Sequence, residues 1–378
     1  MNDFEAILLL SQIPGFSTAK LRALMTQKIA PADFVRHPRS FREFGFDFLT
    51  NEFLESFQKT QSEIDVSKIQ NQCARMGIQI LSYLDSNYPE LLKEIYNPPL
   101  VLYVKGNLIP EDKAAIAVVG SRHASAYGMR VAHRISYELA EAGVTIVSGL
   151  ARGIDAEAHR GAMDARGRTI AILGSGIDVI YPKEHEKLYA EISESGAVVS
   201  EFPFGAPPIA SHFPVRNRII AGLSLGTLVV EAHHRSGSLI TASLTLEAGR
   251  EVYAVPGAID SLNSRGTNGL IKEGAKLVTA SDDILEDLQP VLRHYVLEEK
   301  SVKSETLPEC DHISDAEETK FLGFFDDGAL SFDEIQTESH LSSEQIYSML
   351  VRLELKKWIT RKPGGFYEMN VQTAKGLS

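Results

Sequence analysis

Small residues followed by a single arginine stand at the ends of two short apolar runs in the middle of this chain. Gly-Ser-Arg at residues 120–122 follows Ala-Val-Val, and Ser-Gly-Leu-Ala-Arg at residues 148–152 follows Thr-Ile-Val. Glycine and serine let a ligand approach the backbone closely, and the planar guanidinium group of arginine matches the oxygens of a phosphate. The pair of segments therefore predicts binding of a phosphate-bearing anion, although the first, taken alone, is better explained as a tight turn with an exposed arginine.

Further basic and hydroxyl side chains occupy similar places later in the chain. Lys183 follows Tyr-Pro at a helix start, where a phosphate contact and an ordinary solvated lysine are about equally plausible. Arg216 and Arg218 lie near another helix start, which the helix dipole disfavours for positive charge. Their placement indicates either a binding role or an ion pair with Glu201 or Glu231. Hydroxyls at residues 236–241, at the next helix start, suit an anion. The candidate binding residues are Gly120, Ser121, Arg122, Ser148, Gly149, Arg152, Lys183, Arg216, Asn217, Arg218, Ser238 and Thr241.

The chain lacks the patterns of common nucleotide-using enzymes. It contains no Gly-x-x-x-x-Gly-Lys-Ser/Thr, so nothing argues for nucleotide hydrolysis. Gly-Ser-Gly at residues 174–176 has Val179 where a dinucleotide fingerprint needs its third glycine, which disfavours NAD and FAD. His159 lies four residues after Asp155 and is better explained as a core histidine, because no nucleophile is spaced as its partner. No set of His, Cys and carboxylates has metal-ligand spacing. We therefore expect no catalytic residue, no metal, no cofactor and no enzyme activity.

The elements that must position these residues form a repeating pattern. Short β-branched runs begin near residues 117, 144, 169, 197, 226 and 251, and a helix-like segment follows each of them. This alternation predicts an α/β fold with an extended, Rossmann-like, doubly wound and mostly parallel sheet of about seven strands. Ligands bind outside the carboxyl ends of such strands, so the basic residues should share one rim.

A rim of separated positive charges fits a polymer better than a compact metabolite. Single-stranded nucleic acid needs such a track, usually together with aromatic side chains on which its bases stack. Candidates for stacking are Tyr127, Tyr181, Phe202, Phe204 and Phe213, although most aromatics in such places belong to the core.

The flanking segments predict additional domains. Residues 1–60 are expected to be helical, with Ser17 capping the second helix; this region resembles a SAM-like or helix-hairpin-helix domain, but a small bundle is favoured because few basic residues lie nearby. Residues 61–113 are a connector with two strands that should pair with or dock on the core, which spans 114–290. Residues 291–320 are an acidic linker, and 321–378 are predicted to form a winged helix with a basic cluster. The cluster comprises Arg352, Lys356, Lys357, Arg361 and Lys362.

Charge and cysteine usage narrow the class of protein. The 378 residues include 38 Lys and Arg and 50 Asp and Glu, a formal net charge of -12, so a nucleic-acid site would be a local patch on a repelling background. Cys73 and Cys310 lie far apart and in no metal-binding motif, so neither a disulfide framework nor a zinc site is supported. No stretch looks like a signal peptide or membrane span, and we expect a cytoplasmic protein with no membrane association.

At these residues the sequence resembles the DNA-processing protein A (DprA, also called Smf) family. The resemblance covers residues 114 to 280 approximately, and its motifs occur in the family's order. The motifs include Val119-Gly-Ser-Arg, Ser148-Gly-Leu-Ala-Arg-Gly-Ile-Asp, Gly176-Ile-Asp-Val-Ile-Tyr-Pro-Lys, Phe213-Pro-Val-Arg-Asn-Arg, Ser236-Gly-Ser-Leu-Ile-Thr-Ala and Asn268-Gly-Leu-Ile-Lys-Glu-Gly-Ala.

The resemblance implies a function and partners. It implies a homodimer that binds single-stranded DNA, protects incoming DNA, displaces single-strand-binding protein and loads RecA during natural transformation. It also implies that residues 120–122 hold a backbone phosphate and that Lys183 is a second DNA contact. His185 stands where many relatives have Asn, so the local phosphate contact here is expected to differ.

Two other functions remain possible from the residues alone. One is a nucleotide-handling enzyme of phosphoribohydrolase-like type, although Pro256-Gly-Ala-Ile-Asp lacks the Pro-Gly-Gly-x-Gly-Thr pattern of that class. The other is a scaffold in which the winged helix alone binds the ligand.

Overall fold

The computed structural model describes residues 1–288 and, of the C-terminal part, residues 321–325, 328, 330–339, 341, 346, 349–350, 353, 358–361 and 366–369. The chain divides into two compact units, Met1–Leu297 and Glu298–Ser378. The domain boundaries predicted at residues 60 and 113 fall inside the first unit. The predicted acidic linker, residues 291–320, lies outside the described residues, as does Cys310.

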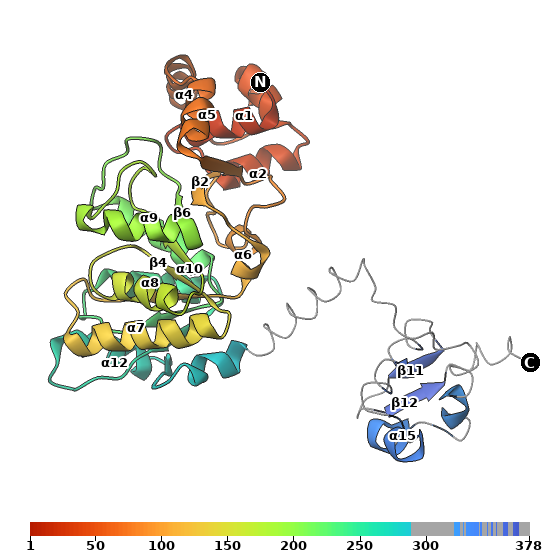
Figure 1. The fold of residues 1–378 in the computed structure, drawn as a ribbon. Helices are drawn as coiled ribbons and strands as arrows, with labels where there is room; N and C mark the ends of the chain where they lie inside the picture. Colours follow the sequence, from red (N-terminus) through yellow and green to blue (C-terminus); the bar gives the residue numbers. More distant parts are fainter. Residues whose placement is uncertain are drawn as a thin grey trace, which may run out of the picture. The chain divides into compact units, whose positions relative to one another are not determined.

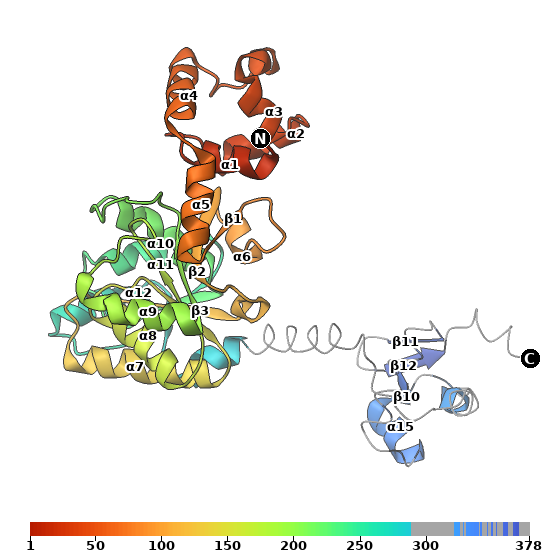
Figure 2. The same cartoon turned by 45° about the horizontal axis from the view of Figure 1, so that its top comes forward.

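Helices open the first unit (red to orange in Figures 1 and 2). They are α1 (Asp3–Ser11), α2 (Thr18–Thr26), α3 (Pro31–Arg36), the 3-10 helix η1 (Pro38–Phe44), α4 (Asn51–Glu63) and α5 (Val66–Met76). A capping box between Asn2 and Glu5 begins α1, whose residues 6–10 are all buried. Ser17 occupies the N-cap position of α2 as predicted, but its side chain makes no capping hydrogen bond. Gln12 Nε2 donates to Tyr103 Oη at 3.3 Å, so these helices are tied to the sheet that follows.

Within residues 1–288 one sheet of nine strands lies at the centre, in the order β1-β2-β6-β5-β4-β3-β7-β8-β9. The strands are β1 (Ile78–Ser82), β2 (Val101–Gly106), β3 (Ala115–Val119), β4 (Thr145–Ser148), β5 (Thr169–Ile172), β6 (Ala197–Ser200), β7 (Gly226–Val229), β8 (Glu251–Ala254) and β9 (Lys276–Leu277). Strands β3 to β9 pair in parallel, whereas β2 pairs antiparallel with β6 and with β1. The predicted doubly wound, mostly parallel sheet is confirmed, and the two strands before residue 113 extend its edge.

Helices cover both faces of this sheet (Figure 1). They are α6 (Glu90–Lys93), α7 (Ala126–Glu141), α8 (Ile154–Asp164), α9 (Glu186–Ser195), α10 (His212–Gly222), α11 (Gly237–Glu247) and α12 (Arg265–Lys272), with the 3-10 helices η2 (Pro110–Lys113), η3 (Lys183–His185) and η4 (Leu262–Ser264). On one face Ile135 of α7 and Ala158 of α8 pack with Ile116 of β3. On the other, Ile219 of α10 and Ala242 of α11 pack with the strands. No helix among residues 1–288 or the described C-terminal residues is long and apolar enough to cross a membrane.

The strand order reverses between β3 and β7. From β3 the chain continues through α7 to β4 on one side, and it crosses from β6 through α10 to β7 on the other. The register pairs Val119 with Val229, so the last residues of these two strands lie side by side. Ligands of open α/β sheets bind in the crevice outside the carboxyl ends at such a reversal. The fold therefore favours a ligand site beside residues 120–122 and 230–238.

The second unit contains a small antiparallel sheet in the order β10-β12-β11. Its described elements are the 3-10 helix η6 (Gly323–Phe325), β10 (Leu330–Ser331), α15 (Phe332–Ser339), β11 (Ile359–Arg361) and β12 (Phe366–Met369). Ile359 pairs with Met369, which gives the predicted hairpin, and Ile335, Leu350 and Leu353 form its core. Arg361 lies in β11, and the rest of the predicted basic cluster lies outside the described residues.

Candidate nucleic-acid interface

A cavity of about 580 Å³ lies at the reversal of strand order, and it is called the groove below. The loops after β3 and β7 line it together with the first turns of α10 and α11. Its lining includes seven of the predicted residues, namely Gly120, Ser121, Arg122, Arg216, Asn217, Ser238 and Thr241. An adjoining small cavity shares Arg122, Tyr181 and Phe213 with the groove and adds Gly149 and Arg152. Most of the predicted residues therefore converge on one surface.

The turn after β3 holds Arg122 at the groove. The Ser121 amide donates to the Glu231 carbonyl at 2.7 Å, which fixes the turn against the end of β7. A Cβ at Gly120 would lie 2.6 Å from the Ile154 side chain and 2.9 Å from the Glu231 carbonyl oxygen, so only glycine fits. Arg122 is exposed, and its guanidinium carbon lies 5.0 Å from the centre of the Phe213 ring. The turn thus presents a solvent-accessible cation beside an aromatic ring.

The loop after β4 lies beside Arg122, and two buried charged side chains hold this loop in place. The Gly149 amide donates to Asp155 Oδ2 at 3.1 Å, and the Gly149 carbonyl accepts from Arg216 Nη1 at 2.8 Å. Arg216 also donates to the Ile172 carbonyl. Burial lowers the pKa of Arg216 to about 10 and raises the pKa of Asp155, while each charge opposes the other's shift. Arg216 is buried and supports the loop through Nη1, whereas its Nε has no hydrogen-bond partner.

Arg152 and Lys183 lie at the outer edge. Arg152 forms an ion pair with Glu184, and both side chains are about half exposed, at 55% and 51%. The hydrogen bond from Arg152 lowers the pKa of Glu184 to about 2, so Glu184 is charged near neutral pH. Lys183 is exposed and directly follows Pro182, which lines the small cavity beside the groove.

The helix starts of α10 and α11 supply polar groups. Asn217 Nδ2 donates to the Gly237 carbonyl at 3.3 Å, and the Ser238 hydroxyl lies 2.7 Å from the hydroxyl of its neighbour Ser236. Thr241 lies one turn further along α11 and is buried at the groove wall. The amide end of α11 therefore opens to the groove with its hydroxyls, as an anion site requires.

The side chains of two predicted residues are held by internal contacts and line neither the groove nor the small cavity beside it. Arg218 forms an ion pair with Glu201 in the interior, so of the two possible acids Glu201 is its partner. Glu231 instead accepts from the Ser125 amide and hydroxyl. Ser148 is fully buried, and its hydroxyl donates to the Val118 carbonyl at 2.6 Å. Both side chains thus make internal contacts, and the assignment of Arg218 and Ser148 to DNA binding stays a prediction.

Of the aromatic residues predicted to stack on bases, some line the groove and others do not. Tyr181 is 41% exposed, and its ring centre lies 5.7 Å from that of Phe213; both line the groove. Phe202 stacks on His212 at 4.1 Å, and Phe204 packs on a buried tyrosine; neither lines the groove. Tyr127 is exposed on α7, outside the groove lining.

Arg235 was missed by the sequence patterns, although it lines the groove and is exposed. It follows β7, so the rule that located Arg122 after β3 applies to it as well. The neighbouring His234 has a pKa below its usual value because of desolvation and the nearby charges of His233, Arg235 and Arg265. Positive charge thus extends from Arg122 toward the start of α12.

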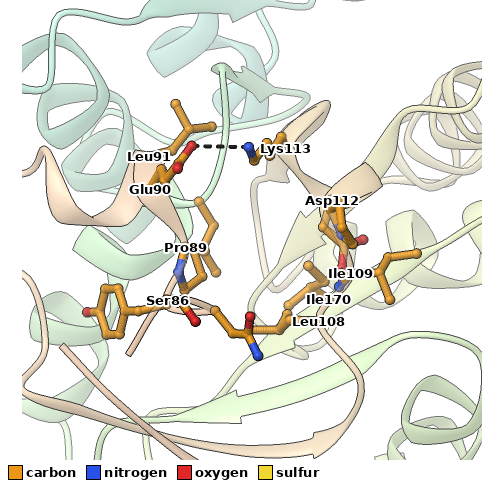
Figure 3. A pocket seen from close by; sticks show the side chains of 13 residues that line it. Ser86, Pro89, Glu90, Leu91, Leu108, Ile109, Asp112, Lys113 and Ile170 are labelled. Atoms are coloured by element: carbon orange, nitrogen blue, oxygen red, sulfur yellow. Dashed lines mark hydrogen bonds and ion pairs between the residues drawn. The ribbon is translucent and has the colours of Figure 1, made fainter. Parts of the chain in front are cut away.

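A separate cavity, of about 240 Å³, lies near the amino end of β5 (Figure 3). Leu108, Ile109 and Ile170 line it, and an ion pair of 3.1 Å joins Lys113 to Glu90 at its side. It lacks the accumulation of exposed arginines that marks the groove. The described residues contain no group of three or more His, Cys, Asp or Glu that could hold a metal ion.

Comparisons with known proteins agree with this architecture. The family model described as "DNA recombination-mediator protein A" matches residues 79–289, more than half of the chain, and "DprA winged helix domain" matches residues 305–365. Protein Smf of Escherichia coli is 43% identical over 289 residues, 75% of this chain and 75% of that protein. DNA processing protein DprA of Streptococcus pneumoniae is 41% identical over 266 residues, 70% of this chain and 88% of that protein.

Solved structures give the same assignment. The X-ray structure of S. pneumoniae DprA superposes with a TM-score of 0.58 at 44% identity, covering 61% of this chain and 81% of that one. A DprA structure from Helicobacter pylori, described as revealing a unique single-stranded DNA binding mode, has a TM-score of 0.52 at 28% identity and covers 57% of this chain and 98% of that one. With the core, the winged helix and relatives above 40% identity all in agreement, the chain belongs to the DNA-processing protein A (DprA/Smf) family.

Proposed function

We propose that this protein is a recombination mediator that binds the backbone of single-stranded DNA in the groove and catalyses no reaction. The observation that carries the proposal is the exposed Arg122 guanidinium, 5.0 Å from the Phe213 ring at the reversal of strand order. A single strand needs a cation for its phosphates and aromatic faces for its bases, and this pair offers both. The H. pylori relative described by its single-stranded DNA binding mode supports the same ligand.

The proposed contacts with DNA are made by the side chains and backbone groups that solvent can reach. Arg122 and the turn before it hold one phosphate, and Lys183 holds a second at the edge of the small cavity. Hydroxyls and amides at the start of α11 complete the track, and Tyr181 with Phe213 stacks bases. Since the net charge is -12, these local cations act against a repelling background, and binding should depend steeply on salt.

Family membership supports a cellular role as well. We propose that the protein works in the cytoplasm as a homodimer, protects incoming DNA, displaces single-strand-binding protein and loads RecA during natural transformation. The description "DNA recombination-mediator protein A" supports the general part of this role. A strand-exchange assay with RecA and single-strand-binding protein tests it, because a mediator shortens the lag before exchange.

The binding proposal is tested by titrating labelled single- and double-stranded oligonucleotides of several sequences at two salt concentrations. We expect a preference for single strands, weak dependence on sequence, and a loss of affinity at the higher salt. Incubation with nucleoside monophosphates forms the parallel arm. Release of a free base would favour the phosphoribohydrolase-like alternative, and binding that persists only through residues 298–378 would favour the winged helix as the binding module.

Glu184→Gln is expected to tighten single-stranded DNA binding by about two- to threefold, because it removes a negative charge beside the track and frees Arg152. An exposed ion pair contributes little to stability, so the melting temperature should stay nearly constant. Glu191→Gln is the matched control, because Glu191 pairs with Lys187 within α9 and lines neither the groove nor the small cavity beside it. Equal affinities for both variants would mean that Arg152 does not contact the DNA.

Arg235→Ala is expected to weaken binding by about fivefold, as the loss of one exposed charge near a phosphate implies. Arg160→Ala is the control, because Arg160 is exposed and pairs with Glu157 outside the groove. Fluorescence anisotropy at low salt measures both. A loss of the same size for both variants would indicate general charge attraction and not a contact at Arg235.

A further inference from the structure

Leu150 adopts an unusual backbone conformation at the edge of the groove. Its φ is 55°, in the left-handed region that residues other than glycine rarely enter. The side chain is fully buried among core residues, so glycine could not replace it without leaving a cavity. Leu150 stands between Gly149 and Arg152, in the loop that borders the small cavity beside the groove. The neighbouring structure must therefore hold this conformation in place.

Two buried histidines from different elements hold both polar groups of Leu150. The Leu150 amide donates to His159 Nε2 of α8 at 3.3 Å. The Leu150 carbonyl lies 2.9 Å from His185 Nδ1 of η3, and because a carbonyl can only accept, this nitrogen carries the proton. The side chain of His159 has no exposed surface, and His185 is buried.

A count of protons fixes the tautomer of His159. The Thr169 hydroxyl donates its single proton to the Ile146 carbonyl at 2.8 Å. His159 Nδ1, 2.7 Å from the same hydroxyl oxygen, must then be the donor in that contact. Its Nε2 is left with a free lone pair, which accepts the Leu150 amide. A second proton on His159 would end this contact, so the arrangement requires the neutral ring.

These contacts join separate parts of the proposed binding surface. His159 belongs to α8, while His185 follows Lys183 and Glu184 in η3. The titratable and charged groups that face His159 are His185, Arg216 and Arg160. The neighbours of Leu150 are held as well, because Asp155 accepts the Gly149 amide. Gly149 and Leu150 are thus held in place by buried polar side chains of α8, η3 and α10.

We propose that His159 and His185 are positioning residues that hold Leu150 in its left-handed conformation and so preform the loop at residues 149–152, which carries Arg152 to the small cavity beside the groove. This inference rests on the proposed function. Neither histidine touches the DNA; both act through the backbone of Leu150. A preformed loop loses little conformational entropy on binding, which is how such a device raises affinity.

The test compares two substitutions of His185 in the full-length protein. His185→Phe keeps a planar ring but removes the donor, and we expect about tenfold weaker binding of a labelled single strand and a flatter salt dependence. His185→Asn keeps an N–H at nearly the same place, and binding should return to within about twofold of the original. Circular dichroism and melting temperatures verify that each variant is folded. Equal affinities for His185→Phe and the original protein would overturn the proposal.

Hydrogen exchange of the unaltered protein provides a test that needs no variant. The Leu150 amide should be protected from exchange equally with and without the oligonucleotide, since the loop is already formed. Protection that develops only when DNA is added would overturn the proposal, because the loop would then be ordered by its ligand. Arg122→Ala separates this failure from failure of the binding site: if Arg122→Ala binds as well as the original protein, the proposed function fails, whatever the histidines do.

Discussion

Arg122→Ala is expected to reduce affinity for single-stranded DNA of any sequence by about 10- to 50-fold at low salt, the largest loss of any single groove substitution. A hydrogen bond between charged groups contributes about 1.5–3 kcal/mol, and Arg122 is the groove cation that is both exposed and stacked beside an aromatic ring. The slope of log affinity against log salt should also fall by about 0.7, the value for one phosphate contact on a single strand.

Two further variants make this expectation specific. Arg122→Lys keeps the charge but loses the planar fork and the stacking surface, so we expect an intermediate affinity with an unchanged salt slope. Arg134→Ala removes an exposed arginine of α7 that lies outside the groove lining, and it should bind like the original protein. If Arg134→Ala and Arg122→Ala lose affinity equally, DNA does not bind at the reversal of strand order.

The sheet was predictable because the signals that specify it are local. Runs such as Ala-Val-Val and Thr-Ile-Val are buried on both faces, as parallel strands require, and small residues end them where the chain must turn. The convergence of residues 120–122 with residues 236–241 followed from the parallel direction of the strands, without knowledge of side-chain contacts.

The contacts of individual charged side chains were not predictable, because their partners are distant in sequence. Arg216 and Arg218 lie two residues apart on α10, yet Arg216 is held by the Gly149 and Ile172 carbonyls and Arg218 by Glu201. Sequence spacing left binding and ion pairing equally open for both. Arg235 could have been found, because it follows β7 as Arg122 follows β3.

The left-handed backbone of Leu150 could not be predicted, because residue rules assign that conformation to glycine or asparagine. It became visible only once α8, η3 and the end of β4 were placed together. The prediction that His159 is a core histidine agrees with its complete burial. The hydrogen bond that His159 accepts from the Leu150 amide shows that a core side chain can also hold the proposed binding loop.

Acidification is expected to destabilise the first unit through His159. Burial, with the charges of His185, Arg216 and Arg160, lowers the pKa of His159 to about 3, whereas an unfolded histidine has a pKa of about 6.5. At pH values between these two pKa values, the unfolded chain binds a proton at His159 that the native protein does not bind. The free energy of unfolding therefore falls as the pH drops below about 6.5. At pH 5 this single group should cost about 2 kcal/mol, at about 1.4 kcal/mol for each pH unit.

The contribution of His159 can be isolated by comparing variants. Asp155 and Glu201 have pKa values raised by burial, so on acidification they protonate earlier in the native state and partly offset the loss. Both groups are present in His159→Gln, whose amide oxygen can still accept the Leu150 amide but cannot titrate. Urea denaturation at pH 7.5 and pH 5 should therefore show about 2 kcal/mol more destabilisation in the original protein than in His159→Gln. Equal losses would mean that His159 binds its proton as readily in the native protein as in the unfolded chain. The ring would then be charged at pH 5, and a charged ring cannot accept the amide that holds Leu150 in place.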